Sequence, residues 1–443
     1  MIEAINDENI KLIKNQDMRN YAEIYTNIAS KFMDGILETG IQIDPVDTTP
    51  AYEEKLEKLR KKGAEIRNDG KSVFVNTISP ACIACQTGVS SATFFTSLKC
   101  NRDCFYCFNP NQENYEFYRD NISDTVSALK AAKDNGQKAS HLALTGGEPL
   151  LHKPEAIRFF TTAKEYFPEV YTRLYTSGDF VDEEILISLK EAGLDEIRFS
   201  IRMQDLERGN NFIFDRIKLA QEYIPQVMVE MPILPDTLEV MKDVLDRLDE
   251  LALYSINLLE LCFPRNNVDE FNKRDFLIKN KPFRVLYDYW YAGGLPVSQS
   301  EMVCLDLLEY VLDNKLKLGV HYCSLENKHS GQIYQQNFDQ PLDGIKFFSN
   351  RDYFLKSAKV FGSDRIPVQQ LLDKNGIHEY DLNEEYNYLE FNIKHIRLLN
   401  KLDENIEIGF CTSVFEEREG DLVLRELKVD MTTPKKFQIS KDV

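Results

Sequence analysis

Short apolar segments alternate with helix-like segments through the middle of this 443-residue chain, and this alternation limits the fold more than any other feature. Six of the apolar segments are rich in β-branched or aromatic residues, as buried parallel strands are. They are ATFFTSL (92–98), SHLALT (140–145), VYTRLYT (170–176), EIRFSI (196–201), QVMVEM (226–231) and SINLLEL (255–261). They recur at roughly 30-residue intervals, the size of a strand–helix unit, and therefore predict an α/β core. A doubly wound sheet and a complete or partial barrel both satisfy this pattern.

The segments on either side of this core have different patterns of apolar residues. Residues 1–70 contain helical patterns, and SVFVNT (72–77) follows as a short strand. After the core, a weaker alternation either extends a barrel or forms a cap; it consists of GLPVS (294–298), SEMVCLDLLEYVLDN (300–314) and LGVHYCS (318–324). Antiparallel strands are predicted at YNYLEFNIKHIRLL (386–399), NIEIGFCTSVFEER (405–418) and DLVLRELKVDM (421–431). We expect an N-terminal helical extension over 1–90, the core over 91–265, a bridging region over 266–340 and a C-terminal β-rich domain over 341–443.

The charge balance and the hydrophobic pattern exclude several classes of partner. Lys and Arg total 53 against 72 Asp and Glu, which gives a formal net charge of -19. Such an acidic chain is poorly suited to bind nucleic acid or an anionic membrane surface. No apolar run approaches the roughly 20 residues that span a bilayer, and charges interrupt the N-terminal segment where a signal peptide has its apolar core. We predict a cytoplasmic protein with no nucleic-acid or membrane partner.

The cysteines are concentrated in one part of the chain. Five of the nine lie between Cys82 and Cys107, which favours metal or iron–sulfur ligation over disulfides in a reducing compartment. The segment KCNRDCFYCF (99–108) has the spacing C-x3-C-x2-C at Cys100, Cys104 and Cys107, directly after the first core strand. Three thiolates on one loop can hold three irons of a cubane cluster and leave the fourth iron open. A zinc loop or incidental cysteines are the alternatives.

A second motif, LALTGGEPLL (142–151), lies at the end of the next predicted strand. Gly146 and Gly147 allow a ligand close to the backbone. Glu148 can accept hydrogen bonds from an amine, and Pro149 stiffens the turn. By itself GGEP is compatible with an ordinary strand-to-helix turn, but its position one unit after the cysteine loop makes the pair specific.

With these two motifs, the chain resembles the radical S-adenosylmethionine (radical SAM) superfamily over its six strand–helix units. The resemblance implies a partial (β/α)6 TIM-like barrel with a [4Fe–4S] cluster on Cys100, Cys104 and Cys107. It implies that SAM chelates the open iron and that Gly146, Gly147 and Glu148, next to Pro149, bind its methionine amino group. Cleavage of SAM would give a 5′-deoxyadenosyl radical, which takes a hydrogen atom from the substrate. Further contacts to SAM are expected at Ser177, Ser200 and Arg202, for which plain turn or core roles are the alternatives.

The remaining cysteines suggest a second site. Cys82 and Cys85 form CIAC, and an auxiliary cluster or zinc site would combine them with Cys323 and either Cys304 or Cys411. A redox dithiol or a structural role is the alternative for the CxxC pair. Cys323 ends a strand-like segment, so it is also a candidate for substrate contact or hydrogen donation.

These features predict a radical SAM enzyme that acts on a peptide or protein. Extensions on both sides of the core suit a large substrate, and a β-rich domain can bind an extended peptide by strand addition. One alternative is a radical SAM enzyme that acts on a small metabolite or activates a glycyl-radical enzyme. A more distant one is a non-catalytic iron–sulfur or zinc protein. The resemblance also implies a flavodoxin- or ferredoxin-type electron donor and sensitivity to oxygen, hence anaerobic function.

Overall fold

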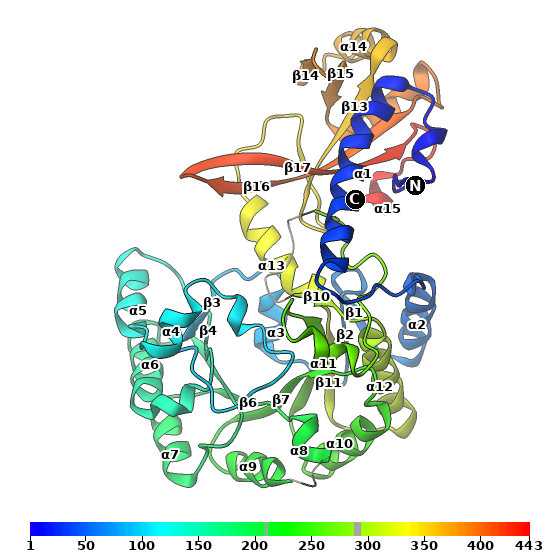
Figure 1. The fold of residues 1–443 in the computed structure, drawn as a ribbon. Helices are drawn as coiled ribbons and strands as arrows, with labels where there is room; N and C mark the ends of the chain where they lie inside the picture. The colour runs from blue at the N-terminus through cyan, green and yellow to red at the C-terminus, as the bar shows by residue number, and fades with distance from the viewer. Residues whose placement is uncertain (208, 210, 288–293) are drawn as a thin grey trace. The chain divides into compact units, whose positions relative to one another are not determined.

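A computed structural model describes residues 1–207, 209, 211–287 and 294–443 of the chain. They form two compact units, each assembled from segments that are distant in the sequence (Figure 1). The first unit contains residues 39–282 and 294–331, and the second contains residues 1–38, 283–287 and 332–443.

The first unit is built on a nine-stranded sheet in the order β1-β2-β11-β8-β7-β6-β5-β4-β3. The six predicted core strands are all present, and each lies parallel to its neighbour in sequence. They are β3 (Ser91–Phe95), β4 (His141–Thr145), β5 (Tyr171–Thr176), β6 (Glu196–Phe199), β7 (Gln226–Ile233) and β8 (Ser255–Glu260). The fold of this unit is therefore α/β, a partial barrel of parallel strands, as the sequence predicts.

A seventh parallel strand, β11 (Gly319–Cys323), extends this barrel beyond β8, with Val320 opposite Ile256. The hairpin of β1 (Glu65–Arg67) and β2 (Ser72–Val75) then adds to β11 in the antiparallel direction. The weak alternation after residue 266 therefore extends the sheet by one strand. The short strands β9 (Cys262–Phe263) and β10 (Leu295–Pro296) pair separately with each other.

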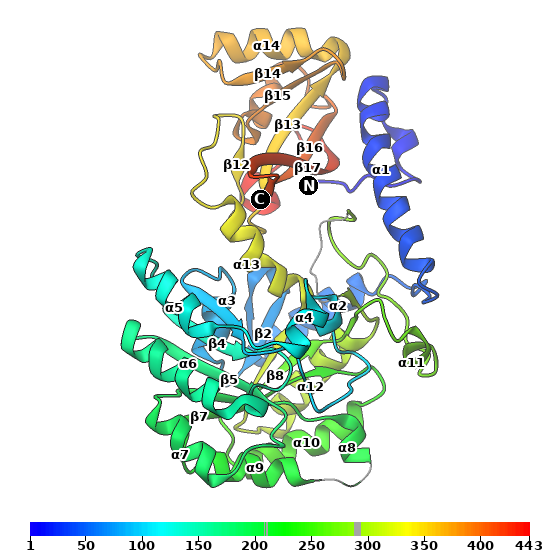
Figure 2. The same ribbon diagram turned by 60° about the vertical axis from the view of Figure 1, so that its left-hand side comes forward.

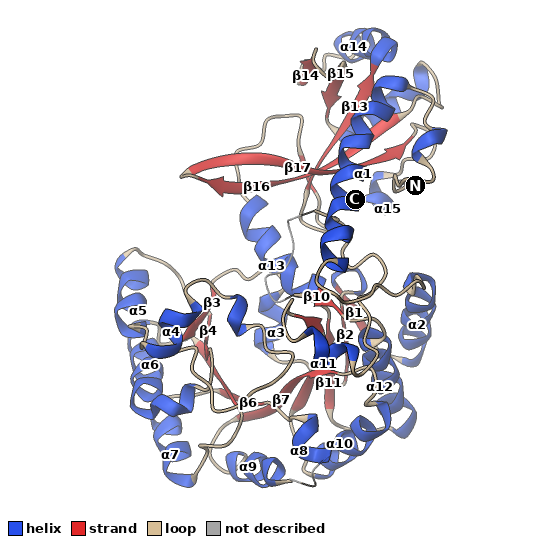
Figure 3. Cartoon of the chain, viewed as in Figure 1, coloured by secondary structure: helices blue, strands red, loops and turns tan. Residues whose placement is uncertain are grey.

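The main helices of the first unit cover the outer face of the barrel (Figures 2 and 3). They are α5 (Thr125–Asp134), α6 (Lys153–Tyr166), α7 (Glu183–Glu191), α9 (Phe212–Ala220), α10 (Leu238–Glu250) and α12 (Ser300–Asn314). Helix α7 shows how local residues set the ends of these helices. Asp182 caps its start by accepting a hydrogen bond from the Ile185 N–H at 2.8 Å. Gly193, with a φ of 84°, follows its end. Within the described residues, no helix has the length and apolar character needed to cross a membrane.

Shorter or peripheral helices complete this unit. They are α2 (Thr49–Lys62), α3 (Pro80–Cys85), α4 (Tyr115–Asp120), α8 (Met203–Glu207), α11 (Val268–Asn272) and α13 (Leu325–Asn337), of which α13 continues into the second unit. Helix α3 carries the CIAC motif, and Pro80 occupies its first turn, where a missing N–H costs nothing.

The second unit is an antiparallel sheet in the order β14-β15-β13-β16-β17, with β12 beside β13. Its strands are β12 (Phe347–Phe348), β13 (Leu355–Phe361), β14 (Tyr380–Asn383), β15 (Tyr388–Phe391), β16 (Ile408–Arg418) and β17 (Asp421–Thr432). Helices α1 (Gln16–Leu37), α14 (Arg365–Lys374) and α15 (Ile439–Asp442) belong to the same unit. A C-terminal β-rich sheet is thus confirmed.

One strand of this sheet is shorter than predicted. The strand expected over 386–399 ends at Phe391, and a 3₁₀ helix occupies Ile393–Lys401. Asn392 causes the change, because its side chain accepts a hydrogen bond from the Lys394 N–H at 3.1 Å and so caps a helical turn. The prediction is therefore wrong for residues 393–399.

A buried lysine joins α1 to this sheet. The Lys359 ammonium, 2 % exposed, donates to Glu426 and to the Tyr21 hydroxyl, each at 2.7 Å. It also lies 4.2 Å from the ring centre of Tyr388, and the Tyr25 hydroxyl donates to Glu426 at 2.7 Å. Burial opposes ionisation of Glu426, but Lys359 and the two hydroxyls outweigh it and lower the pKa of this carboxyl. The pair is therefore fully charged and satisfied on both sides.

Glu426→Gln should lower the free energy of unfolding by about 3 kcal/mol, because it leaves the Lys359 charge buried without a counter-ion. The depressed pKa of Glu426 means that this contribution is present at neutral pH and is lost as the pH falls through that depressed value. Denaturant unfolding from neutral to acidic pH measures both effects. Glu417→Gln, at an exposed position of β16, should change stability by less than about 0.5 kcal/mol. Equal effects of the two substitutions would contradict this account.

Candidate active site

The cysteine loop follows β3 and is tied to the GGEP turn by backbone hydrogen bonds. The N–H of Gly147 donates to the Ser97 carbonyl at 3.0 Å, and that of Glu148 donates to the Lys99 carbonyl at 2.9 Å. The residue that begins the C-x3-C-x2-C motif, Cys100, comes directly after this contact. The two motifs that the sequence singles out are therefore in direct contact.

The two glycines of GGEP are required by this close approach. A Cβ atom on Gly147 would lie 1.9 Å from the Lys99 carbonyl oxygen, and one on Gly146 would lie 2.5 Å from that of Ser97. Gly146 also has a φ of 116°, which other residues rarely adopt. Any side chain at either position would displace the loop that carries the three cysteines.

Glu148 links the end of β4 to the end of β5 through hydrogen bonds. Its side chain is buried, and its carboxylate accepts hydrogen bonds from the Leu150 N–H at 3.0 Å, the Thr176 hydroxyl at 2.9 Å and the Ser177 N–H at 2.7 Å. Burial raises the pKa of Glu148, although these hydrogen bonds oppose the shift. Pro149 begins the short 3₁₀ helix that follows, Pro149–His152. The motif thus fixes the turn after β4 against the turn after β5.

The thiols of Cys100, Cys104 and Cys107 share one loop and interact electrostatically. Burial raises the pKa of Cys100 to about 11, and Glu148, Cys104 and Cys107 add to this rise. Burial also raises the pKa of Cys104, whereas Arg202 and a hydrogen bond from Tyr106 lower it. Without a cation, several thiolates at this position would repel one another. Within the described part of the chain, no three His, Cys, Asp or Glu side chains are gathered closely enough to hold a metal ion.

Two acidic side chains, Asp179 after β5 and Asp205 on α8, contact the cysteine loop. Asp179 accepts a hydrogen bond from the Asn101 amide at 2.6 Å and pairs through both carboxylate oxygens with the guanidinium of Arg102. Asp205 lies 3.4 Å from the same guanidinium. These contacts use Asn101 and Arg102, two of the three polar residues between Cys100 and Cys104. Sequence patterns did not identify Asp179.

The structure places the three predicted SAM contacts at the ends of β5 and β6. Ser177 follows β5 and donates its N–H to Glu148, while Ser200 follows β6 and donates its N–H to the Thr176 carbonyl at 3.0 Å. Arg202 affects the pKa of Cys104 and Tyr106, and its Nε has no hydrogen-bond partner among the described residues. GGEP, Ser177, Ser200 and Arg202 therefore surround the same end of the barrel as the cysteine loop.

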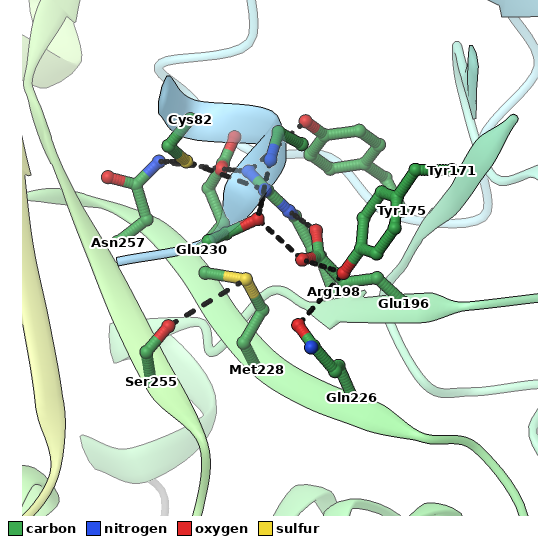
Figure 4. A network of polar contacts seen from close by, with 12 residues as sticks. Cys82, Tyr171, Tyr175, Glu196, Arg198, Gln226, Met228, Glu230, Ser255 and Asn257 are labelled. Atoms are coloured by element: carbon green, nitrogen blue, oxygen red, sulfur yellow. Dashed lines mark hydrogen bonds and ion pairs between the residues drawn. The ribbon is translucent and has the colours of Figure 1, made fainter. Parts of the chain in front are cut away.

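Inside the barrel, a charged network centres on Arg198 of β6 (Figure 4). Its Nε donates to Glu196 at 2.6 Å, one terminal nitrogen pairs with Glu230, and the other lies 3.4 Å from the Cys82 sulfur. Asn257 of β8 donates to Glu230 at 2.7 Å. Sequence reasoning missed this network, although the charged residues in the otherwise apolar segments EIRF and QVMVEM could have indicated it.

Several of the other cysteines are buried near this network. Cys323 accepts a hydrogen bond from the Asn327 amide at 3.2 Å. Burial raises the pKa of Cys323 to about 12. Electrostatic interactions with Cys82 and Cys85 also raise its pKa. Burial also raises the pKa of Cys304, and the interaction with Cys323 adds to that rise. Cys411 lies in the second unit, on β16. The structure thus groups Cys82, Cys85, Cys304 and Cys323 in the barrel unit without assembling them into a metal site among the described residues.

Gly147→Ala should displace the cysteine loop, because its Cβ would overlap the Lys99 carbonyl. After anaerobic reconstitution, we expect this variant to bind much less iron than the wild type while its circular dichroism spectrum stays similar. Gly35→Ala is the matched control, since its Cβ would meet no atom within 4 Å. Full iron content in Gly147→Ala would contradict the proposed dependence of the loop on this contact.

Comparison with known proteins identifies this barrel. Residues 95–248 match the family model described as the radical SAM superfamily. A protein of Methanocaldococcus jannaschii, named for a proposed role as a glycyl-radical enzyme activating enzyme, is 28% identical over 318 residues, which are 66% of this chain and 80% of that protein. The PqqA peptide cyclase of Granulibacter bethesdensis is 30% identical over 113 residues, 25% of this chain and only 28% of the cyclase.

Among solved structures, Streptococcus suis SuiB bound to its precursor peptide SuiA is similar at 12% identity and a TM-score of 0.39. That similarity covers 68% of this chain and 62% of SuiB. The family match coincides with the strand–helix units that carry the cysteine loop and GGEP. Residues 95–248 are therefore a radical SAM domain.

Proposed function

We propose that this radical SAM enzyme acts on a peptide or protein, and that Cys100, Cys104 and Cys107 hold its [4Fe–4S] cluster. The chemistry of the donors supports such a cluster, because the three thiols share one loop and their thiolate forms need a neighbouring positive charge. When bound, the cluster and SAM supply a 5′-deoxyadenosyl radical that removes a hydrogen atom from the substrate. GGEP holds the loop, Ser177 and Ser200 offer hydroxyls at the strand ends, and Arg202 offers a guanidinium to a carboxylate.

The open edge of β17 is the observation that carries the peptide assignment. Among the described residues, β17 pairs with β16 on one side, and its other side is met only by a single bridge between Glu3 and Met431. The exposed residues Leu422 and Val423 lie on the part of β17 beyond that bridge. An exposed apolar strand edge is an aggregation hazard unless a partner strand covers it, and an extended peptide is such a partner. The name of the related PqqA peptide cyclase agrees with a peptide substrate.

Activation of a glycyl-radical enzyme is a second candidate function. It is favoured by the M. jannaschii relative, which this chain matches over 80% of its length. In that case the substrate would be a folded partner enzyme and the product a radical on one of its glycines. The two candidates share a polypeptide substrate and differ in whether a closed-shell modified peptide or a stable protein radical is formed.

Deuterium transfer tests the substrate class directly. The anaerobically reconstituted enzyme is reduced with dithionite and given SAM together with a deuterated cell extract, which is divided by filtration into proteins with peptides and small molecules. We expect deuterium in 5′-deoxyadenosine, read by mass spectrometry, from the polypeptide fraction only. Cys104→Ala, which removes one proposed cluster ligand, should give none. Transfer only from the small-molecule fraction would contradict the proposal, and a glycyl-radical signal in electron paramagnetic resonance would favour the second candidate.

Leu422→Pro should weaken the binding of an extended peptide about fivefold, the effect of losing one hydrogen bond of about 1 kcal/mol. Glu419 and Gly420 have positive φ and form a two-residue turn between the paired residues Arg418 and Asp421, so the N–H of Leu422 points away from β16. The expected result is a lower deuterium yield at limiting polypeptide, with unchanged SAM cleavage in its absence. Leu422→Ala keeps the N–H and is the control. Identical yields from both variants would show that this edge does not bind the substrate.

A further inference from the structure

A second arginine inside the barrel, Arg173, forms no ion pair with any residue that the structure describes. Arg173 lies on β5 between Tyr171 and Tyr175 and is 8% exposed. Among the described residues its side chain makes no hydrogen bond or ion pair, and its Nε is buried without a partner. Its guanidinium carbon lies 5.7 Å from the ring centre of Tyr175. A guanidinium cannot lose its proton, so this burial leaves the Nε–H of a charged group without an acceptor.

Two carboxylates in the barrel, Glu196 and Glu230, have other hydrogen-bond partners. Glu196 accepts hydrogen bonds from Arg198, from the Ser79 hydroxyl at 2.6 Å and from the Tyr171 hydroxyl at 2.9 Å. Glu230 forms an ion pair with Arg198 and accepts a hydrogen bond from the Asn257 amide. The charge of Arg173 lowers the pKa of Glu230 without a direct contact between them. Arg198 therefore uses both carboxylates, and Arg173 makes direct contact with neither.

Polar atoms without partners also lie on the opposite strands. The Asn257 Oδ1 of β8 and the His321 Nδ1 of β11 are buried and have no hydrogen-bond partner among the described residues. Asn257 and His321 are opposite each other in the sheet register. His321 is held through its other nitrogen, which lies 2.8 Å from the Ser72 hydroxyl. Three strands thus contribute unsatisfied polar groups, which is the pattern of a binding site and not of a packed core.

We propose that Arg173 binds a carboxylate of the substrate inside the barrel, while Asn257 accepts a hydrogen bond from an N–H group of the same substrate. The planar guanidinium matches a carboxylate through two parallel hydrogen bonds. Within the proposed function, on which this assignment rests, the carboxylate belongs to an acidic side chain or to the C-terminus of the peptide. SAM is not its source, because Ser177, Ser200 and Arg202 lie beyond the ends of the strands, whereas Arg173 lies within β5.

The site orients the substrate relative to the cysteine loop. Arg173 precedes the last residue of β5, Thr176, by three positions, and the loop contacts the turns beyond these strand ends. A substrate anchored by its carboxylate on Arg173 would extend toward that end of the barrel, where the hydrogen atom is removed. Arg173 is thereby assigned as a residue that determines substrate specificity.

Thermal unfolding of the full chain with carboxylate probes tests this assignment without turnover. Glutarate and glutaramide are compared at equal ionic strength, as are acetylated and amidated Gly-Glu-Gly and Gly-Gln-Gly. We expect the carboxylate probes to raise the melting temperature of the wild type more than their amide analogues. Arg173→Met should weaken this binding about 10- to 100-fold, and Arg173→Lys should retain part of it. An equal response of Arg173→Met and wild type, or no response of the wild type to any carboxylate probe, would overturn the assignment.

The probe-free melting temperature separates a binding role from a structural one. Arg173→Met removes a charge that acts on Glu230 only at a distance and should lower this temperature less than Arg198→Met, which leaves Glu196 and Glu230 without their direct counter-ion. If both substitutions destabilise the chain equally, Arg173 is structural and the proposal fails. A response to glutarate but not to Gly-Glu-Gly would support the carboxylate site and count against the peptide substrate. The two proposals can therefore fail independently.

Discussion

Close packing of backbone against backbone, between Gly147 and Lys99, is the contact on which the candidate site depends. No Cβ fits between these residues, and the hydrogen bonds on either side of the contact hold the cysteine loop against the turn after β4. Glu148 in turn fixes the position of the turn after β5, because it accepts hydrogen bonds from Thr176 and Ser177. Three successive strand ends are thus locked around one loop. Such rigidity suits a catalyst that must generate a reactive radical beside its target atom and away from water.

The polar interior of the barrel complements this rigid end. An ordinary barrel of this size fills its centre with branched apolar side chains. Here β5, β6, β7 and β8 direct Arg173, Arg198, Glu230 and Asn257 inward. The Arg198 network satisfies its own charges, so its cost in desolvation is offset by good geometry. Arg173 has no such direct ion pair among the described residues, and this difference between the two neighbouring arginines separates a structural ion network from the proposed binding residue.

The sequence predicts the parts of the structure that depend on local patterns. The six core strands are predicted because buried parallel strands are short apolar segments, and α12 because its apolar residues repeat at helical spacing. The 3₁₀ helix after Phe391 is missed because a local cap at Asn392 overrides an apolar segment that resembles a strand. The partnership of α1 with the C-terminal sheet depends on Tyr21 meeting Lys359, a contact across more than 300 residues that no local pattern contains. For the site, spacing identifies the thiols and GGEP, while Asp179 and Arg173 acquire their roles only through neighbours in space.

Iron and acid-labile sulfide per chain, measured after anaerobic reconstitution, test the central claim most directly. The wild type is compared with Cys100→Ala/Cys104→Ala/Cys107→Ala, in which all three loop thiols are removed. If the loop holds the catalytic cluster, the wild type binds about four irons more than the variant. Iron retained by the variant beyond background would then belong to the cysteines of the barrel unit. Equal iron in the two proteins would contradict the assignment of the cluster to this loop.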